Sequence, residues 1–323
     1  MRLLAAAVAA LACLAQEDAV FRVDVGLVTV PVQVTAPDGS LVRDLKPEDF
    51  QLFDAGERQE IRNLWLETEL PLTIGIVLDV SDSQGASISA HERTLVDFVS
   101  RVLRLGDRAF VVSVGSEVRM LADLTSSRED LIRGLRDAER PDAGTIFGEQ
   151  CLKRAFAPVP PDPKPLVVSM CGGTALWNGI WSAVRLRLLP ATGRKALLIL
   201  SDGVDTGSSH PLKHAITELH RAQGVVYAIQ YPRGPRARAS FGLQRLAEES
   251  GGLRFPAPEA GSDAAESYAK IFARIEEDLR NQYVIGFRPS SERAGFHPIE
   301  VTTGRENLRV RARLGYIAGG EQK

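Results

Sequence analysis

Hydrophobic and polar residues alternate at both ends of the chain, which is the pattern of β-strands with one buried face. Near the N-terminus the alternation covers residues 21–65 and is interrupted by the turns 36–39 and 54–57. Near the C-terminus it returns in three runs, at residues 283–287, 299–302 and 308–314. Neither end alone has enough strands to bury a stable core. We therefore predict one β-sandwich-like domain, formed by residues 16–69 plus 281–323, with two separate small β-domains as the alternative.

Between these ends, short apolar runs alternate with amphipathic segments of helical period. Residues 73–78 are almost wholly apolar, which is typical of a strand buried on both faces of a parallel sheet. Apolar residues then recur at helical spacing from Leu95 to Leu103, and the alternation continues up to a long helix over residues 264–280. The pattern predicts an α/β fold over residues 70–280, with a doubly wound, mostly parallel sheet inserted into the β-sandwich-like domain.

One helix start can be predicted from local chemistry. Ser126 precedes an amphipathic segment, and Glu129 follows three positions later. This spacing is that of a capping box, in which each side chain bonds the backbone N–H of the other residue. We therefore expect Ser126 to cap this helix.

The first segment of the chain has the character of a signal peptide. Residues 3–15 are apolar, follow Met1 and Arg2, and are shorter than the roughly 20 residues that span a membrane. We predict cleavage after residue 15 and an exported protein, which is periplasmic, secreted or at the cell surface. Cleavage before Cys13, with a lipid attached there, stays open, and an N-terminal core helix is the remaining alternative.

Composition narrows the class of protein without identifying it. The chain has 323 residues, 25% charged and 44% hydrophobic, with a net charge of −2, close to the averages of globular proteins. This length suits two domains. The balanced charge argues against a nucleic-acid partner. The sequence has no Gly-x-Ser-x-Gly elbow and no Walker-type phosphate loop, and we predict that the protein is not an enzyme.

The candidate chemistry lies where predicted strands end. Asp79, Ser81 and Ser83 follow the apolar run 73–78, at the edge where open α/β sheets bind ligands. Thr174 lies in a Gly-Gly-Thr loop before a helix, and Asp202 ends a second buried strand. Such hard oxygens suit Mg²⁺, Mn²⁺ or Ca²⁺. Taken alone, the segment after the first strand would equally suit a turn and a helix N-cap.

The three motifs together resemble a known family. Asp-x-Ser-x-Ser, then Gly-Thr, then Ser-Asp-Gly occur in the order found in the von Willebrand factor A domain, over roughly residues 71–280. Asp79, Ser81, Ser83, Thr174 and Asp202 match its metal-ion-dependent adhesion site. The flanking runs at 45–50 and 282–287, and the chain's ending at 310–316, resemble those of secreted acidobacterial members of the family.

The resemblance implies a function and a role for each of these residues. Ser81, Ser83 and Thr174 would bind Mg²⁺ or Mn²⁺ directly, and Asp79 and Asp202 would act through bound waters. An Asp or Glu carboxylate of a partner protein would complete the coordination, which makes the domain a metal-dependent adhesion or interaction module. In some members, occupancy of the site shifts the last helix, and residues 264–280 are its counterpart.

Two other functions stay open. A Mg²⁺-dependent phosphatase-like hydrolase also places an aspartate after a buried strand, but it would need a second carboxylate at the position of Ser81. A structural module with a vestigial metal site is the other alternative.

The chain departs from the family in a Pro-rich insertion at about residues 139–171, which contains Cys151 and Cys171. A long loop of this kind inside a compact domain is usually functional or disordered. Because exported proteins often join such cysteines, we hypothesise that the two form a disulfide beside Thr174. Two free thiols are the alternative.

Two weaker signals involve basic side chains. A Pro/Gly loop after a predicted strand, on the same edge as the metal motifs, is a candidate rim for an acidic partner or an ordinary solvated loop, and it carries Arg233, Arg236 and Arg238. A predicted helix further upstream carries three histidines that we expect to be solvated, His210, His214 and His220.

Overall fold

The structure is a computed structural model that describes residues 27–68, 70–81, 85–138, 140, 144–146, 174–232, 241–259, 261, 263–291 and 293–319. For residues 85–92 and 146 it describes the backbone alone.

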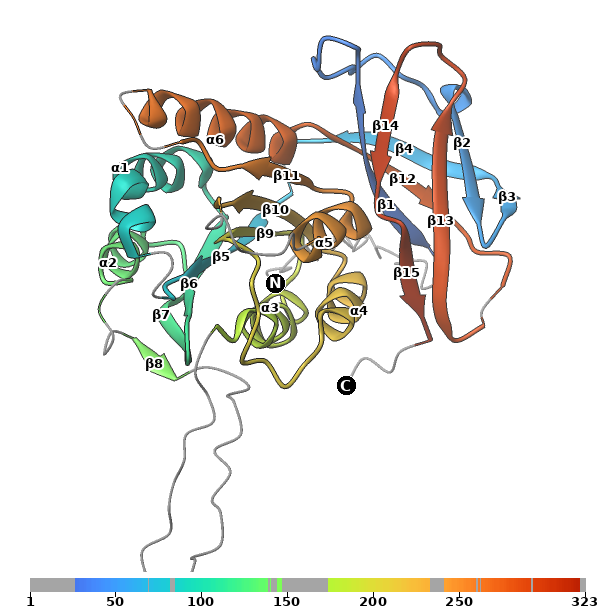
Figure 1. Cartoon of the computed structure of the whole chain (residues 1–323). Coiled ribbons are helices and arrows are strands. Elements are labelled where there is room, and N and C mark those ends of the chain that lie inside the picture. The colour runs from blue at the N-terminus through green and yellow to red at the C-terminus, as the bar shows by residue number, and fades with distance from the viewer. Residues whose placement is uncertain are drawn as a thin grey trace, which may run out of the picture.

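The largest element of the fold is a seven-stranded sheet with the order β11-β10-β9-β5-β6-β7-β8 (Figure 1). The strands from β11 to β6 are parallel, whereas β7 runs antiparallel to β6 and β8 antiparallel to β7. The predicted mostly parallel sheet is therefore confirmed. The strands are β5 (Leu72–Asp79), β6 (Arg108–Val114), β7 (Val118–Thr125), β8 (Thr145–Ile146), β9 (Arg194–Ser201), β10 (Val225–Gln230) and β11 (Leu253–Pro256).

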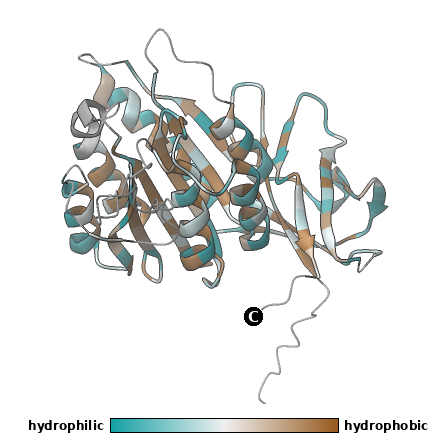
Figure 2. Cartoon of the chain, turned by 60° about the horizontal axis from the view of Figure 1, so that its bottom comes forward, coloured by the Kyte–Doolittle hydropathy of each residue, from teal (hydrophilic) through white to brown (hydrophobic). Residues whose placement is uncertain are grey.

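Helices cover both faces of this sheet, as the doubly wound prediction requires. One face carries α1 (Gly85–Val102), α2 (Arg128–Arg136) and α6 (Ala264–Arg280). The other carries α3 (Leu176–Ala183) with its π-helical continuation (Val184–Leu188), α4 (Leu212–Ala222) and α5 (Gly242–Ser250). Ile76 packs into the first layer and Val77 into the second, so β5 is apolar on both faces. Figure 2 shows these central strands as mostly hydrophobic. None of the described helices is long and apolar enough to cross a membrane.

Strands from both ends of the chain form two antiparallel sheets, with the orders β14-β1-β12-β4 and β15-β13-β2-β3. Their facing residues, among them Val32, Leu52 and Ile285, share one hydrophobic core, so the predicted insertion of the α/β unit into a β-sandwich is confirmed. The exact boundaries of the two domains stay a prediction. The strands are β1 (Val28–Thr35), β2 (Phe50–Asp54), β3 (Glu57–Gln59), β4 (Ile61–Glu67), β12 (Gln282–Phe287), β13 (Gly295–Thr303), β14 (Arg309–Ala312) and β15 (Gly315–Ala318), with a 3₁₀ turn (Pro47–Asp49) before β2.

Two local predictions have different outcomes. The turn between β2 and β3 is a two-residue hairpin in which Ala55 and Gly56 both have positive φ, 49° and 83°, as the turn sequence indicated. The predicted cap of α2 is wrong by one residue. Ser127, not Ser126, caps the helix, because its hydroxyl accepts a hydrogen bond of 3.2 Å from the N–H of Asp130.

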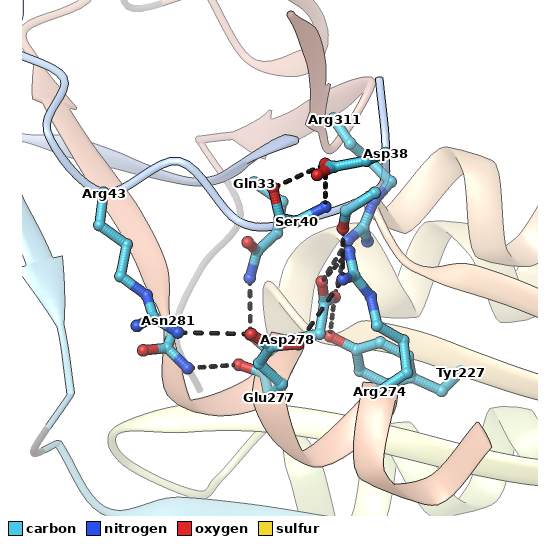
Figure 3. Close-up of polar contacts among 11 residues, drawn as sticks. Gln33, Asp38, Ser40, Arg43, Tyr227, Arg274, Glu277, Asp278, Asn281 and Arg311 are labelled. Atoms are coloured by element: carbon cyan, nitrogen blue, oxygen red, sulfur yellow. Dashed lines mark hydrogen bonds and ion pairs between the residues drawn. The ribbon is translucent and has the colours of Figure 1, made fainter. Parts of the chain in front are cut away.

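A buried carboxylate joins the α/β unit to the sandwich. Asp278, near the end of α6, is fully buried. Arg311 of β14 donates to both carboxylate oxygens, at 2.6 and 2.7 Å, and the hydroxyl of Tyr227 of β10 donates at 2.7 Å (Figure 3). Gln33 of β1 donates to the backbone carbonyl of Asp278 at 2.6 Å. One residue therefore connects α6, the central sheet and the first antiparallel sheet.

This arrangement predicts an unequal effect of two neighbouring substitutions. Asp278→Ala leaves the guanidinium of Arg311 without its buried partner, so we expect the free energy of unfolding to fall by about 3–5 kcal/mol. Glu277→Ala is the matched control, because Glu277 makes a solvent-exposed ion pair with Arg43 at 3.4 Å, worth about 1 kcal/mol or less. Denaturant unfolding of both variants checks this, and equal losses would contradict a special role for Asp278.

Candidate functional site

The site is built around Asp79, the last residue of β5, which is fully buried. One carboxylate oxygen, Oδ1, accepts hydrogen bonds from the hydroxyl and the N–H of Ser81, at 2.6 and 3.1 Å. The other oxygen, Oδ2, accepts one from the hydroxyl of Ser201 at 2.6 Å. Three donors therefore fix the orientation of this carboxylate at the carboxyl edge of the central sheet.

The electrostatics of Asp79 disfavour an uncompensated negative charge. Burial raises the pKa of the Asp79 carboxyl above its ordinary value, and the nearby Asp202 carboxylate raises it further. Hydrogen bonds from Ser201 and Ser81 lower the pKa, but they do not outweigh the burial. Because a buried charge is costly unless it is paired, a cation near Asp79 and Asp202 would stabilise both carboxylates.

Asp202 is held by a tight turn at the end of β9. Its Oδ1 accepts a hydrogen bond from the N–H of Val204 at 2.8 Å, and its backbone carbonyl accepts one from the amide of Gln230 at 3.2 Å. Gly203 has a φ of 73°, a conformation that glycine adopts without strain. The N–H of Gly203 donates to the hydroxyl of Ser201 at 2.9 Å, so the turn also positions the group that bonds Asp79.

Thr174 is brought to the same edge by its backbone. Its carbonyl accepts hydrogen bonds from the N–H groups of Thr206 and Gly207, both at 3.0 Å, in the loop that follows Asp202. The next residue, Ala175, donates to the carbonyl of Gly115, just beyond the end of β6, at 2.8 Å. The loop before α3 therefore lies between the ends of β6 and β9, with Thr174 buried to 5% exposure.

The loop after β9 also caps α3. Asp205 accepts a hydrogen bond from the N–H of Trp177 at 3.1 Å, and Ser208 accepts one from the N–H of Asn178 at 2.9 Å. These are the first-turn donors that a helix cannot satisfy internally. Burial raises the pKa of the Asp205 carboxyl, while its hydrogen bonds to Ser208 and Trp177 oppose that shift. One loop therefore presents Asp202 and fixes the helix that follows Thr174.

The donor set that is described fits a hard cation. Asp79 and Asp202 supply carboxylates, and Ser81 and Thr174 supply hydroxyls, all of which are oxygen ligands. Within the described ranges, no three His, Cys, Asp or Glu side chains form a metal-binding group. Carboxylate and hydroxyl oxygens of this kind would suit Mg²⁺, Mn²⁺ or Ca²⁺.

Several predicted residues lie outside the described part of the chain. Ser83, the fifth predicted ligand, is one of them, and so are both cysteines of the hypothesised disulfide, Cys151 and Cys171. The same holds for the candidate rim of Arg233, Arg236 and Arg238. Their roles stay predictions.

Two features of the structure differ from what the sequence predicts. Ser201 was noted only as part of the Ser-Asp-Gly motif, yet its hydroxyl contacts Asp79. The sequence alone gives no signal for this contact, because it depends on the pairing of the preceding residues, Leu78 and Leu200, on adjacent parallel strands. The prediction that His220 is solvated is wrong. It is buried on α4, where its ring nitrogens lie 3.0 Å from the carbonyl oxygen of Gly315 and 3.2 Å from Oε2 of Glu249.

Among the comparisons with known proteins, only the comparison with solved structures finds similar proteins. No family model matches the chain, and no curated protein matches it. One similar structure is "von Willebrand factor type A from Catenulispora acidiphila", with a TM-score of 0.46 and 12% identity, covering 92% of this chain and 74% of that one. Another is "conserved hypothetical protein BatB from Bacteroides thetaiotaomicron", with a TM-score of 0.41 and 15% identity, covering 64% and 98%.

A third similar structure is proximal thread matrix protein 1 from the mussel byssus "with zinc occupied MIDAS motif". Its TM-score is 0.46 and its identity 17%, and the match covers 70% of this chain and 49% of the mussel protein. The chain thus spans about half the length of that protein.

Proposed function

We propose that this chain is an exported, metal-dependent protein-binding module. Asp79, Ser81, Ser83, Thr174 and Asp202 would hold one Mg²⁺, or Mn²⁺ or Ca²⁺ in its place, and an Asp or Glu carboxylate of a partner protein would complete the coordination. The observation that supports this most directly is the buried Asp79 carboxylate, which contacts Ser81 and lies close to Asp202 at the carboxyl edge of the sheet.

Each described residue has a distinct part in this proposal. Asp79 and Asp202 supply the negative charge that attracts a divalent cation, and Ser81 and Thr174 supply neutral oxygens. Ser201 positions Asp79 through the hydrogen bond to Oδ2. The bound cation would supply an electrophilic position for a partner carboxylate. Because hydroxyls carry no charge, the cation keeps a net attraction for that carboxylate.

The first prediction concerns the ligands. We expect Asp79→Ala and Thr174→Ala each to abolish measurable Mg²⁺ binding while the circular dichroism spectrum stays unchanged, because a small site needs all of its oxygens. Glu117→Ala is the matched control, since this carboxylate lies in the loop after β6 and pairs with Arg119 at 2.9 Å. It should bind Mg²⁺ like the wild type. Calorimetry that finds equal affinity in all four proteins would reject the site.

The second prediction concerns Ser201, whose hydroxyl touches Asp79 but is not a proposed ligand. Removing a group that orients a metal ligand typically weakens metal affinity by about 10–100-fold, and we expect Ser201→Ala to weaken Mg²⁺ binding within that range. Ser100→Ala is the control, because the Ser100 hydroxyl only bonds a carbonyl within α1, at 2.8 Å. An unchanged affinity in Ser201→Ala would show that the hydrogen bond to Asp79 has no part in metal binding.

The third prediction concerns the partner. A pull-down from the native extracellular fraction should recover a protein with Mg²⁺ present and lose it with EDTA or with Asp79→Ala. Changing one surface Asp or Glu of the recovered protein to Asn or Gln should abolish the interaction. Metal-dependent hydrolysis of a generic phosphate ester, lost in Asp79→Ala, would instead support the phosphatase-like alternative.

A further inference from the structure

A second candidate site lies at the opposite edge of the central sheet. A cavity of about 180 Å³ opens between the amino ends of β5, β9 and β10 and the face of the β14-β1-β12-β4 sheet. Leu72, Arg194 and Val225, which begin those three strands, line one side. Residues of β1, β4 and β12 line the other. The metal-site residues Asp79 and Asp202 lie at the carboxyl ends of β5 and β9, so the two sites are distinct.

The size and lining of the cavity suit one small apolar ring. An apolar cavity of roughly 150 Å³ accommodates benzene, so this cavity has room for a ring with one substituent. Its walls include Pro31, Leu72, Ala222, Val225, Leu279 and Val284. Trp65 and Leu70 also line it and are 36% and 46% exposed, which places two large apolar side chains where a ligand could cover them.

The charged groups at the cavity differ in how well they are paired. The carboxylate of Glu67 accepts hydrogen bonds from the indole of Trp65 at 2.9 Å and from the N–H of Leu70 at 2.7 Å. The guanidinium of Arg194 donates to the carbonyls of Leu70 and Leu279, at 3.1 and 2.5 Å. The hydrogen bonds of Glu67 and Arg194 therefore join residues that line the cavity.

Lys195 differs from its neighbours. Its side chain is half-buried and lines the cavity, and its ammonium has a contact of 3.4 Å with the carbonyl of Leu189. Burial alone lowers the pKa of Lys195, and no carboxylate among the described residues contributes an opposing shift. A half-buried ammonium beside an apolar cavity favours a ligand that brings a negative charge.

We propose that this cavity binds a small carboxylic acid anion with a single apolar ring. The ring would lie between the two sheets, against Trp65 and Val284, and the carboxylate would pair with the ammonium of Lys195. Domain junctions are common places for such sites. Because the walls come from both sheets, the ligand would stabilise the contact between the α/β unit and the sandwich.

Benzoate is the probe that tests this proposal. The titration is done in EDTA, so that a carboxylate cannot bind through a metal at the other edge. We expect saturable binding of one benzoate per chain below about 10 mM. In nitrogen-edited NMR spectra the indole N–H resonance of Trp65 should shift, while those of Trp177 and Trp181 on α3 should not.

Two comparisons test the role of Lys195. Lys195→Met should weaken benzoate binding by at least about tenfold, whereas Lys213→Met, which removes an exposed ammonium of α4, should leave it unchanged. Wild-type protein should bind the neutral analogue benzamide at least about tenfold more weakly than benzoate. Absence of saturable binding, equal affinities for the two ligands, or full affinity in Lys195→Met would overturn the proposal. None of these outcomes depends on Mg²⁺ binding, so failure here leaves the proposed metal site to its own tests.

Discussion

The ion pair between Arg311 and the fully buried carboxylate of Asp278 joins the α/β unit to the sandwich. The Asp278 carboxylate cannot be left unpaired in that position without a large cost in free energy. The residues beside it add to the same junction, because Arg194 bonds the carbonyl of Leu279 at 2.5 Å and Arg280 contacts Asp107 and the carbonyl of Val102. The carboxyl end of α6 is therefore tied to the amino edge of the central sheet and to β14 together. A displacement of α6 along its axis would have to break all of these contacts.

The carboxyl edge of the same sheet is arranged differently. Asp79 is as deeply buried as Asp278, yet its hydrogen bonds come from hydroxyls and an N–H group, with no cation among the contacts that the structure gives it. The second carboxylate, Asp202, adds repulsion. The protein thus pairs one buried acid with a guanidinium, whereas the hydrogen bonds that the structure gives the other come from uncharged donors. This contrast separates a residue that holds the fold from one that we propose binds a ligand.

The sequence predicted the features that depend on periodic burial. The insertion of the α/β unit into the β-sandwich follows from three such patterns. These are apolar strands with two buried faces, amphipathic helices and alternating strands at both ends of the chain. The strands β11 and β15 were not predicted, because each has only four residues and neither lies within a longer predicted run, as β14 does. The helix cap was misplaced because Ser126 and Glu129 have the spacing of a capping box, whereas the structure uses the hydroxyl of the adjacent Ser127. The contacts of Asp278 and Ser201 join residues far apart in the chain, and they become visible only once strand order and register are known.

One consequence of the strand order concerns the timing of folding during synthesis. β1 lies between β12 and β14, so the first strand of the described chain pairs only with strands near its end. Contacts between segments so far apart in the sequence form slowly. Conformational entropy is lost when the two segments come together, before strand pairing stabilises them. Until the last strands have been made, Val30, Val32 and Val34 have no partner strand, and an unpaired apolar strand is prone to aggregate. A chain with this topology can complete its β-sandwich only after the strands β12 and β14 have been synthesised.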